Sequence, residues 1–157
     1  MTTIGVISDT HGLLRPEAVE ALRGSALILH AGDVGVPEVL TELRRIAPVT
    51  AVRGNVDRAA WAWELRNREV VEVEDVSIYV LHILDELDLK PEAAGFGVVV
   101  YGHSHMPKSE VKNGVLYFNP GSAGPRRFKL PVTAGRLVVE GRTVRGEIIE
   151  FGVSGSR

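Results

Sequence analysis

The first third of the chain alternates short apolar runs with helix-like segments, and this alternation restricts the fold more than any other feature. Buried strands are predicted over residues 3–8, 26–30 and 49–53, because each is a short run rich in Val, Ile, Leu or Ala beside turn-forming residues. Helices are predicted to begin at Pro16 and Pro37, since proline is tolerated in the first turn of a helix. This order of elements is typical of a parallel sheet covered by helices.

The rest of the chain is predicted to be rich in strands. Apolar and acidic residues alternate over 70–74, which favours an antiparallel edge strand, and apolar runs over 77–83 and 97–101 favour buried strands. Residues 84–94 are acidic and fit either a helix or an ordered loop. Hairpins with Asn-Gly and Glu-Gly turns are predicted for the remaining strands, over 109–112, 115–119, 131–139 and 143–151.

Length and composition fit one globular domain. The chain has 157 residues, of which 45% are hydrophobic and 24% charged, and this balance is that of an ordinary folded protein. We expect a single domain over residues 1–151 and a flexible tail over 152–157, where the residues are mostly small and polar. A parallel first half and an antiparallel second half predict an α/β fold of two mixed sheets, packed face to face with helices outside.

Charge and composition argue against several classes of protein. The formal net charge is −2, so no bulk field attracts the chain to nucleic acid. No apolar run approaches the roughly 20 residues that span a bilayer, and no basic segment precedes an apolar core at the start, so neither a membrane segment nor a signal peptide is expected. The absence of cysteine removes disulfides and thiolate ligands and suits the expected cytoplasmic location.

Side chains that bind metals follow nearly every predicted strand of the first two thirds. In open α/β sheets, ligands bind beyond the carboxyl ends of the strands. The candidates are two aspartates, one asparagine and four histidines: Asp9, His11, Asp33, Asn55, His82, His103 and His105. Seven groups are too many for one tetrahedral site and suit two ions that share a carboxylate. Nitrogen and oxygen donors without sulfur favour Mn, Fe, Zn, Co or Ni over Ca or Mg.

These residues lie in motifs that resemble those of the calcineurin-like metallophosphoesterases. The motifs occur in the family order: DTHG at 9–12, GD at 32–33, GNVD at 54–57, His82, GHSH at 102–105 and NPGS at 119–122. The resemblance extends over about residues 3–151 and is strongest to the small bacterial and archaeal phosphodiesterases, which are related to the retromer subunit Vps29. It implies a four-layer α/β/β/α sandwich.

The resemblance also implies two metal sites. The first ion would be held by Asp9, His11, Asp33 and His105, and the second by Asp33, Asn55, His82 and His103. Asp33 would bridge them, with one ion on each carboxylate oxygen, and Asn55 would also lie within hydrogen-bonding reach of the phosphate. A hydroxide between the metals would attack phosphorus in line, so the implied activity is that of a phosphodiesterase on a small phosphoester. Manganese is the expected metal, with Fe, Zn, Ni or Co as alternatives.

Two positions depart from the family pattern. Val56 stands where larger members have a histidine that assists the leaving group, so no general acid is identified and monoester hydrolysis is disfavoured relative to diester hydrolysis. Ile83 and Leu84 stand where the family usually has Gly-His, so His82 fits either a ligand or a core histidine. These departures leave open a second function, a catalytically weak or inactive metal-binding scaffold of the Vps29 kind.

Other residues have less specific signals. Arg126 and Arg127 follow a Gly-Pro pair and are candidates for binding the phosphate, although a solvated pair explains them equally well. His30 is interpreted as a core residue or as a support for a metal ligand. Trp61 and Trp63 favour core packing or a homodimer contact over the stacking of nucleic-acid bases.

Overall fold

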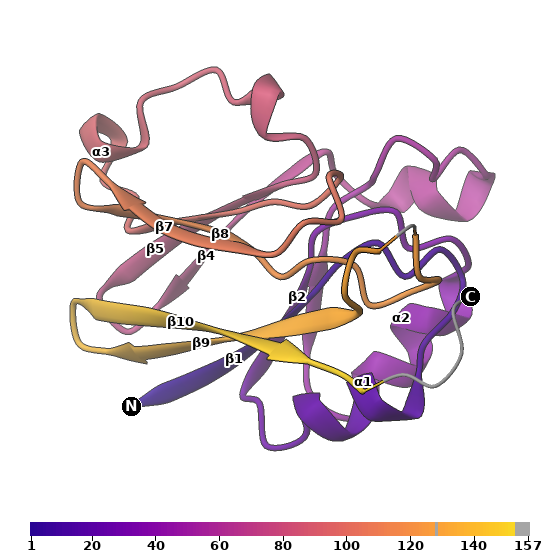
Figure 1. The fold of residues 1–157 in the computed structure, drawn as a ribbon. Coiled ribbons are helices and arrows are strands. Elements are labelled where there is room, and N and C mark those ends of the chain that lie inside the picture. Colours follow the sequence, from indigo (N-terminus) through magenta and orange to yellow (C-terminus); the bar gives the residue numbers. More distant parts are fainter. Residues whose placement is uncertain (128, 153–157) are drawn as a thin grey trace.

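Two five-stranded sheets pack face to face in the computed structural model, which describes residues 1–127 and 129–152 (Figure 1). The first sheet has the order β10-β9-β1-β2-β3. Its strands are β1 (Thr2–Ile7), β2 (Leu27–His30), β3 (Val49–Ala51), β9 (Thr133–Glu140) and β10 (Thr143–Glu150). Strands β1, β2 and β3 are parallel, as predicted, and β9 runs antiparallel to both β1 and β10.

The second sheet is mixed as well, with the order β4-β5-β6-β8-β7. Its strands are β4 (Arg68–Val73), β5 (Val76–Leu81), β6 (Val98–Val100), β7 (Lys108–Lys112) and β8 (Val115–Asn119). The edge strands β4 and β7 are antiparallel to their neighbours, whereas β5, β6 and β8 are parallel. The expectation of two mixed sheets is confirmed, whereas that of an antiparallel second half holds only in part, because the chain crosses over between β5, β6 and β8 instead of turning back directly.

Helices cover the outer face of the first sheet. Helix α1 (Pro16–Leu22) and helix α2 (Pro37–Arg44) begin at the prolines predicted from the sequence. Their buried residues, among them Leu22 and Leu43, pack with Ile7 and Ile28 of the sheet. A short 3-10 helix, η1 (Ala60–Glu64), follows β3, and its Trp61 joins the same apolar layer. Within the described ranges the longest helix, α2, has eight residues, and none could cross a membrane.

The outer face of the second sheet has a thinner cover. Residues 84–94 form two helical turns joined by a loop, the 3-10 helix η2 (Leu84–Glu86) and helix α3 (Pro91–Ala94). Leu84, Leu87 and Phe96 of this region pack on Tyr79 and Tyr101. Between the sheets lies a core of apolar residues from both, including Ile4, Leu29, Val80, Val98 and Phe118. The four-layer α/β/β/α sandwich is thereby confirmed, whereas the predicted tail lies, apart from Gly152, outside the described residues.

Strand register brings the carboxyl ends of the parallel strands together. Ile7 at the end of β1 lies opposite His30 in β2, and His30 lies opposite Ala51 in β3. In the second sheet Val80 of β5 lies opposite Val100 of β6. The loops that follow these strands therefore leave each sheet at one end, and these two ends adjoin, since Nε2 of His82 after β5 lies 3.2 Å from Oδ2 of Asp33 after β2.

Candidate metal centre

All seven candidate ligands lie in the loops or at the chain positions directly beyond these strand ends. Six of them form two clusters of nitrogen and oxygen donors. The first cluster consists of Asp9, His11 and His105, and the second consists of Asp33, His82 and His103. Asn55 contacts the second cluster through a hydrogen bond with His103. The structure thus brings together every residue that the sequence analysis predicted as a ligand.

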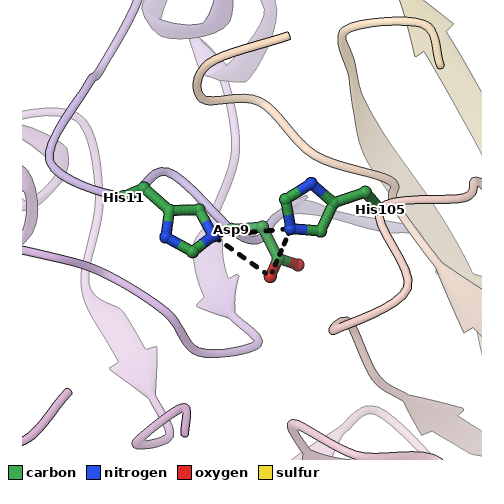
Figure 2. Close-up of side chains that lie close together, drawn as sticks. All are labelled: Asp9, His11 and His105. Carbon is green, nitrogen blue, oxygen red and sulfur yellow. Dashed lines mark hydrogen bonds and ion pairs between the residues drawn. The ribbon is translucent and has the colours of Figure 1, made fainter. Parts of the chain in front are cut away.

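In the first cluster, Asp9 presents one carboxylate oxygen to two imidazoles (Figure 2). Its Oδ2 accepts hydrogen bonds from the hydroxyl of Ser8 at 2.7 Å and from the amide of His103 at 3.1 Å. Its Oδ1 lies 3.3 Å from Nε2 of His105 and 3.8 Å from Nε2 of His11. This Oδ1 is buried and has no hydrogen-bond partner among the described residues, so its lone pairs face the cluster.

In the second cluster, a main-chain contact orients His82. Its Nδ1 lies 2.7 Å from the carbonyl oxygen of Ala31, and its Nε2 lies 3.2 Å from Oδ2 of Asp33. His103 lies edge-on to His82, with ring centroids 5.2 Å apart, and its Nδ1 is 3.1 Å from Oδ1 of Asn55. Nε2 of His82 is buried and, within the described part of the chain, has no hydrogen-bond partner.

Asp33 lies between the two clusters. Its Oδ1 accepts a hydrogen bond from the amide of Val56 at 3.0 Å. Its Oδ2 lies 3.6 Å from Nε2 of His11 in the first cluster and 3.2 Å from Nε2 of His82 in the second. The sequence analysis expected one ion on each oxygen, but here a single oxygen faces both sets of donors.

The donor spacing fits divalent metal ions. Ligands about 2.0–2.2 Å from one ion lie about 2.8–3.1 Å from their neighbours in octahedral geometry and about 3.3–3.6 Å in tetrahedral geometry. The Nε2 atoms of His11 and His105 are 3.4 Å apart, and the contacts already described are 3.1, 3.2 and 3.3 Å long. Cations between these donors would satisfy the buried lone pairs of Asp9 and His82, which otherwise carry a desolvation cost.

The protonation of the centre also favours cation binding. Burial opposes the ionisation of Asp9 and Asp33, but contacts with His105 and His82 outweigh it, so the pKa of each carboxyl is lowered. Burial likewise disfavours the charged form of His82, but the neighbouring Asp33 and Asp9 raise its pKa. The two carboxylates are therefore anionic at neutral pH and hold a concentrated negative charge in a mostly buried place.

Five of the seven candidate ligands have a left-handed backbone. The φ angles are +56° for Asp9, +47° for His11, +56° for Asp33, +73° for His103 and +63° for His105. Such conformations are uncommon outside glycine and cluster at functional sites, where surrounding contacts maintain the strain. The chain turns sharply at each of these residues, and the turns aim side chains from separate loops at a common centre.

A family model matches most of the chain. A model described as the calcineurin-like phosphoesterase superfamily domain matches residues 2–142. The chain belongs to this superfamily. It is 36% identical, over 95% of its own length and 92% of the relative's, to a probable metallophosphoesterase of Methanothermobacter thermautotrophicus.

Solved structures of the superfamily share this fold. An archaeal phosphodiesterase aligns with a TM-score of 0.78 and 25% identity, over 94% of this chain and 100% of the other. Vps29 of Chaetomium thermophilum aligns with a TM-score of 0.77 and 20% identity, over 96% and 98% of the two chains. The second likeness concerns the fold alone. As a calcineurin-like phosphoesterase, the chain belongs to a group of metallophosphoesterases and phosphodiesterases that bind divalent metals.

Two glycines of this phosphoesterase allow the loops to approach one another. Gly32 has a φ of +103°, and a Cβ there would lie 2.7 Å from Nδ1 of His82. A Cβ on Gly54 would overlap both the main chain and the carboxylate of Asp33. Only glycine fits at these two positions, because the ligand-bearing loops of β2 and β3 touch there.

Hydrogen bonds from residues outside the ligand set hold the loops in place. The buried carboxylate of Asp57 accepts from the amides of Val34, Gly35 and Gly54, and so ties the loop after β3 to the loop after β2. The place of Asp57 in the GNVD motif favours a structural residue over a ligand, and these hydrogen bonds agree with that interpretation.

The NPGS motif has a similar supporting role. The amide of Asn119 donates to the carbonyl oxygen of Gly102 and the hydroxyl of Ser104, within the GHSH segment. The hydroxyl of Ser122 donates to the carbonyl oxygen of Asp9. The motif therefore fastens the loops that carry ligands of both clusters, and the sequence alone did not show these contacts.

His30 supports the centre from the core. It is fully buried, and its Nδ1 accepts from the amide of Gly32 at 3.1 Å. Its Nε2 lies 3.0 Å from the hydroxyl of Thr10, which itself donates to the carbonyl oxygen of Val34. Both ring nitrogens thus have hydrogen-bond partners within the protein. This agrees with the interpretation of His30 as a residue that supports the metal ligands and does not bind the metal itself.

The remaining candidates lie around the centre at different distances. Arg127 is exposed. Burial lowers the pKa of His11, and the positive charge of Arg127 lowers it further, whereas the negative charge of Asp33 raises it; the net effect is a lowered pKa. Nε of Arg126 donates to the carbonyl oxygen of Leu130, and Arg126 lines a hollow that contains none of the seven ligands. The side chain of Val56 is 46% exposed, and Trp63 is 71% exposed.

Proposed function

We propose that this protein is a dinuclear metal-dependent phosphodiesterase that hydrolyses a small phosphoester. The observation that carries the proposal is the position of Asp33, whose Oδ2 faces Nε2 of His11 on one side and Nε2 of His82 on the other. The first ion is assigned to Asp9, His11, Asp33 and His105, and the second to Asp33, Asn55, His82 and His103. A shared carboxylate oxygen between two sets of donors is suited to holding two cations close together.

The protein's residues would position the phosphate and balance its charge. When bound, the two ions supply an activated water for in-line attack and polarise the phosphoryl oxygens. Manganese is the expected metal, and Fe, Zn, Ni or Co are the alternatives. Asn55, which is hydrogen-bonded to His103, and the exposed Arg127, whose charge acts on His11, are the residues that would contact an anionic substrate. A phosphate-binding role for Arg126 stays a prediction.

Val56 favours a diester with a good leaving group. Its side chain reaches solvent beside Asn55 and can neither donate nor accept a proton. General acid catalysis contributes about 10²–10⁴-fold to many reactions, so its absence at this position favours alcohols that leave readily as anions. The similarity to an archaeal phosphodiesterase supports the same choice.

The test uses bis-p-nitrophenyl phosphate and the whole protein, stripped of metal and then loaded with Mn²⁺. We expect turnover only in the loaded protein, with a loss of about 10³-fold or more in Asp33→Asn, because Asn cannot supply the bridging anion. Metal analysis should give two ions per chain in the loaded wild type and fewer in the variant. Asp75→Asn, in the turn between β4 and β5, is the matched control and should behave as the wild type. Equal rates in stripped and loaded protein, with Asp33→Asn unaffected, would refute the proposal.

A second function is favoured by two exposed apolar residues that adjoin candidate ligands in the chain. Val56 and Met106 directly follow Asn55 and His105 in the chain, and their side chains are 46% and 56% exposed. A metal-binding scaffold would use such a surface to dock a partner protein. Two bound ions without turnover of any phosphoester would support this alternative.

A homodimer through the exposed Trp63 is tested separately by light scattering of the wild type and Trp63→Ser.

A further inference from the structure

Two separate hollows flank the ligands of the second cluster. The first has a volume of about 210 Å³ and is lined by Arg53, Asn67 and Glu86 together with the candidate ligands Asn55 and His82. The second has a volume of about 220 Å³ and is lined by Leu84, Asp85 and Tyr101 together with the candidate ligand His103. Ile83 lines both hollows and therefore lies between them.

The first hollow has both hydrogen-bond donors and acceptors. Nε and Nη2 of Arg53 lie 3.2 and 3.1 Å from Oδ1 of Asn67, which fixes the guanidinium at the wall. Asn67 is the only hydrogen-bond partner of the Arg53 side chain among the described residues, and a guanidinium has five N–H donors. Glu86 also lines this hollow, and a glutamate carboxylate accepts hydrogen bonds. A neutral group with hydroxyls matches this hollow, because an anion would meet Glu86 and a cation would meet Arg53.

The second hollow is mainly apolar. Ile83 and Leu84 are half-buried, Tyr101 is 7% exposed, and Leu84 packs on the same apolar cluster as Tyr101. Asp85 also lines this hollow and opposes a second anionic group there. Aliphatic and aromatic walls of this kind favour an apolar or aromatic substituent.

A phosphodiester has two substituents on one phosphorus, and the centre has two hollows beside it, one polar and one mainly apolar. We infer that the substrate is an unsymmetrical phosphodiester, with a neutral hydroxyl-bearing group, such as a sugar or glycerol, in the hollow of Arg53 and an apolar or aromatic group in the hollow of Leu84. This inference rests on the proposed phosphodiesterase function. Ile83 is a specificity-determining residue in this arrangement, because it separates the two substituents. The Ile83-Leu84 pair, at which the chain departs from its family, thereby gains a role.

The test compares two probes with the same leaving group. One is the mixed phosphodiester of glycerol and p-nitrophenol, and the other is methyl p-nitrophenyl phosphate. Hydrolysis adds one water across the phosphorus–oxygen bond of each and releases p-nitrophenol with glycerol phosphate or methyl phosphate. The Mn²⁺-loaded wild type should prefer the glycerol diester by about tenfold in kcat/KM, because hydrogen bonds to charged groups are worth that much or more.

Variants of both hollows separate their contributions. Arg53→Met should bring the glycerol-to-methyl ratio of kcat/KM close to one, and Ile83→Gly should lower the ratio because the substituents can then exchange places. Leu84→Ser should raise KM for both probes and leave the ratio unchanged. Arg45→Met, an exposed arginine next to helix α2, is the matched control and should leave all values unchanged.

A binding measurement without turnover completes the test. In titration calorimetry, glycerol 3-phosphate should bind the wild type about tenfold more tightly than methyl phosphate, and Arg53→Met should lose this difference. Equal kcat/KM for the two probes in wild type and Arg53→Met, with no difference in binding, would overturn the assignment of the hollows and leave the phosphodiesterase function intact. Absence of turnover with a retained preference for glycerol 3-phosphate would overturn the hydrolytic function and still support the polar hollow as a binding site.

Discussion

Nδ1 of His82 lies 2.7 Å from the main-chain oxygen of Ala31, and this contact selects the ring nitrogen that faces the metal centre. A carbonyl oxygen only accepts hydrogen bonds, so Nδ1 carries the hydrogen. In the neutral ring the lone pair of Nε2 is then free for a cation, which would lie between Nε2 and the facing oxygen of Asp33. Metal-binding histidines are usually oriented in this way. His82 therefore has the orientation of a ligand, although Ile83 and Leu84 follow it in place of the usual family residues.

Replacement of His82 should remove one ion and leave the other. His82→Asn shortens the side chain, so no donor reaches the position of Nε2, while the donors of the first cluster are unchanged. We expect the Mn²⁺ content of the loaded protein to fall from two ions per chain to one, with a loss of activity of about 100-fold or more. Elemental analysis after gel filtration measures the content. Retention of two ions would place His82 among core residues only.

Metal binding should stabilise the fold. Asp9 and Asp33 bring two carboxylates close together in a buried place, and cations offset their repulsion. At a free Mn²⁺ concentration about 100 times the dissociation constant, the gain is about 2.7 kcal/mol, which raises Tm by about 5–10 °C in a chain of this size. Thermal unfolding with and without Mn²⁺ measures it. Asp33→Asn should lose most of the shift and Asp75→Asn should keep it; equal shifts in both variants would contradict the assigned site.

Gly32→Ala should disturb the centre specifically. The new methyl group would lie 2.7 Å from Nδ1 of His82 and 3.0 Å from Cα of Gly54, at a φ of +103°. We expect a loss of about 2–4 kcal/mol in the free energy of unfolding and weaker Mn²⁺ binding. Gly24→Ala is the matched control, because Gly24 has a φ of +84° and open space around it. This control has only backbone strain, so its urea midpoint should fall less and its Mn²⁺ affinity should not change.

His30 should make stability depend on pH between about 6.5 and 4. Burial lowers its pKa to about 4, whereas the unfolded chain has the ordinary value of 6.5. Between these values the unfolded state binds more protons, so stability is full above pH 6.5 and falls by roughly 3 kcal/mol as the pH drops to 4. Urea unfolding of metal-free wild type and His30→Gln across this range measures the difference. The variant should be less stable at pH 7, and the gap should narrow in acid; a constant gap would contradict the prediction.

Glu74 should stabilise the opposite end of the sandwich in a pH-dependent manner. Its Oε2 accepts from the hydroxyl of Thr2 and its Oε1 from the amide of Gly141, each at 2.6 Å, and these contacts lower its pKa from 4.5 to about 2. Its contribution is complete above pH 4.5 and is lost as the pH falls towards 2. Glu74→Gln should therefore be less stable than the wild type at pH 7 but not near pH 2. Glu72→Gln, an exposed residue of β4, is the control and should match the wild type at every pH.

The sequence predicted those features that depend on local pattern. Short apolar runs gave the strands that end before Asp9, Asp33 and Asn55, and Pro16 and Pro37 gave the starts of both main helices. Local pattern did not give the pairing of β6, which is parallel to both of its neighbours, because a continuous apolar run indicates a buried strand but not the strands beside it. The same limit applied to residues 84–94, where short helical turns have too few residues for a periodic signal.

The sequence by itself determined the fold class and the superfamily and predicted the seven candidate ligands, because residue type and motif order are properties of the chain alone. Only the tertiary structure decided that one oxygen of Asp33 faces both clusters, that Ala31 orients His82 and that Ile83 separates two unlike hollows. The physical reason is distance along the chain: His11 and His105 are 94 residues apart and yet their nitrogens lie 3.4 Å from one another. Such contacts depend on how two sheets pack, which no local pattern records.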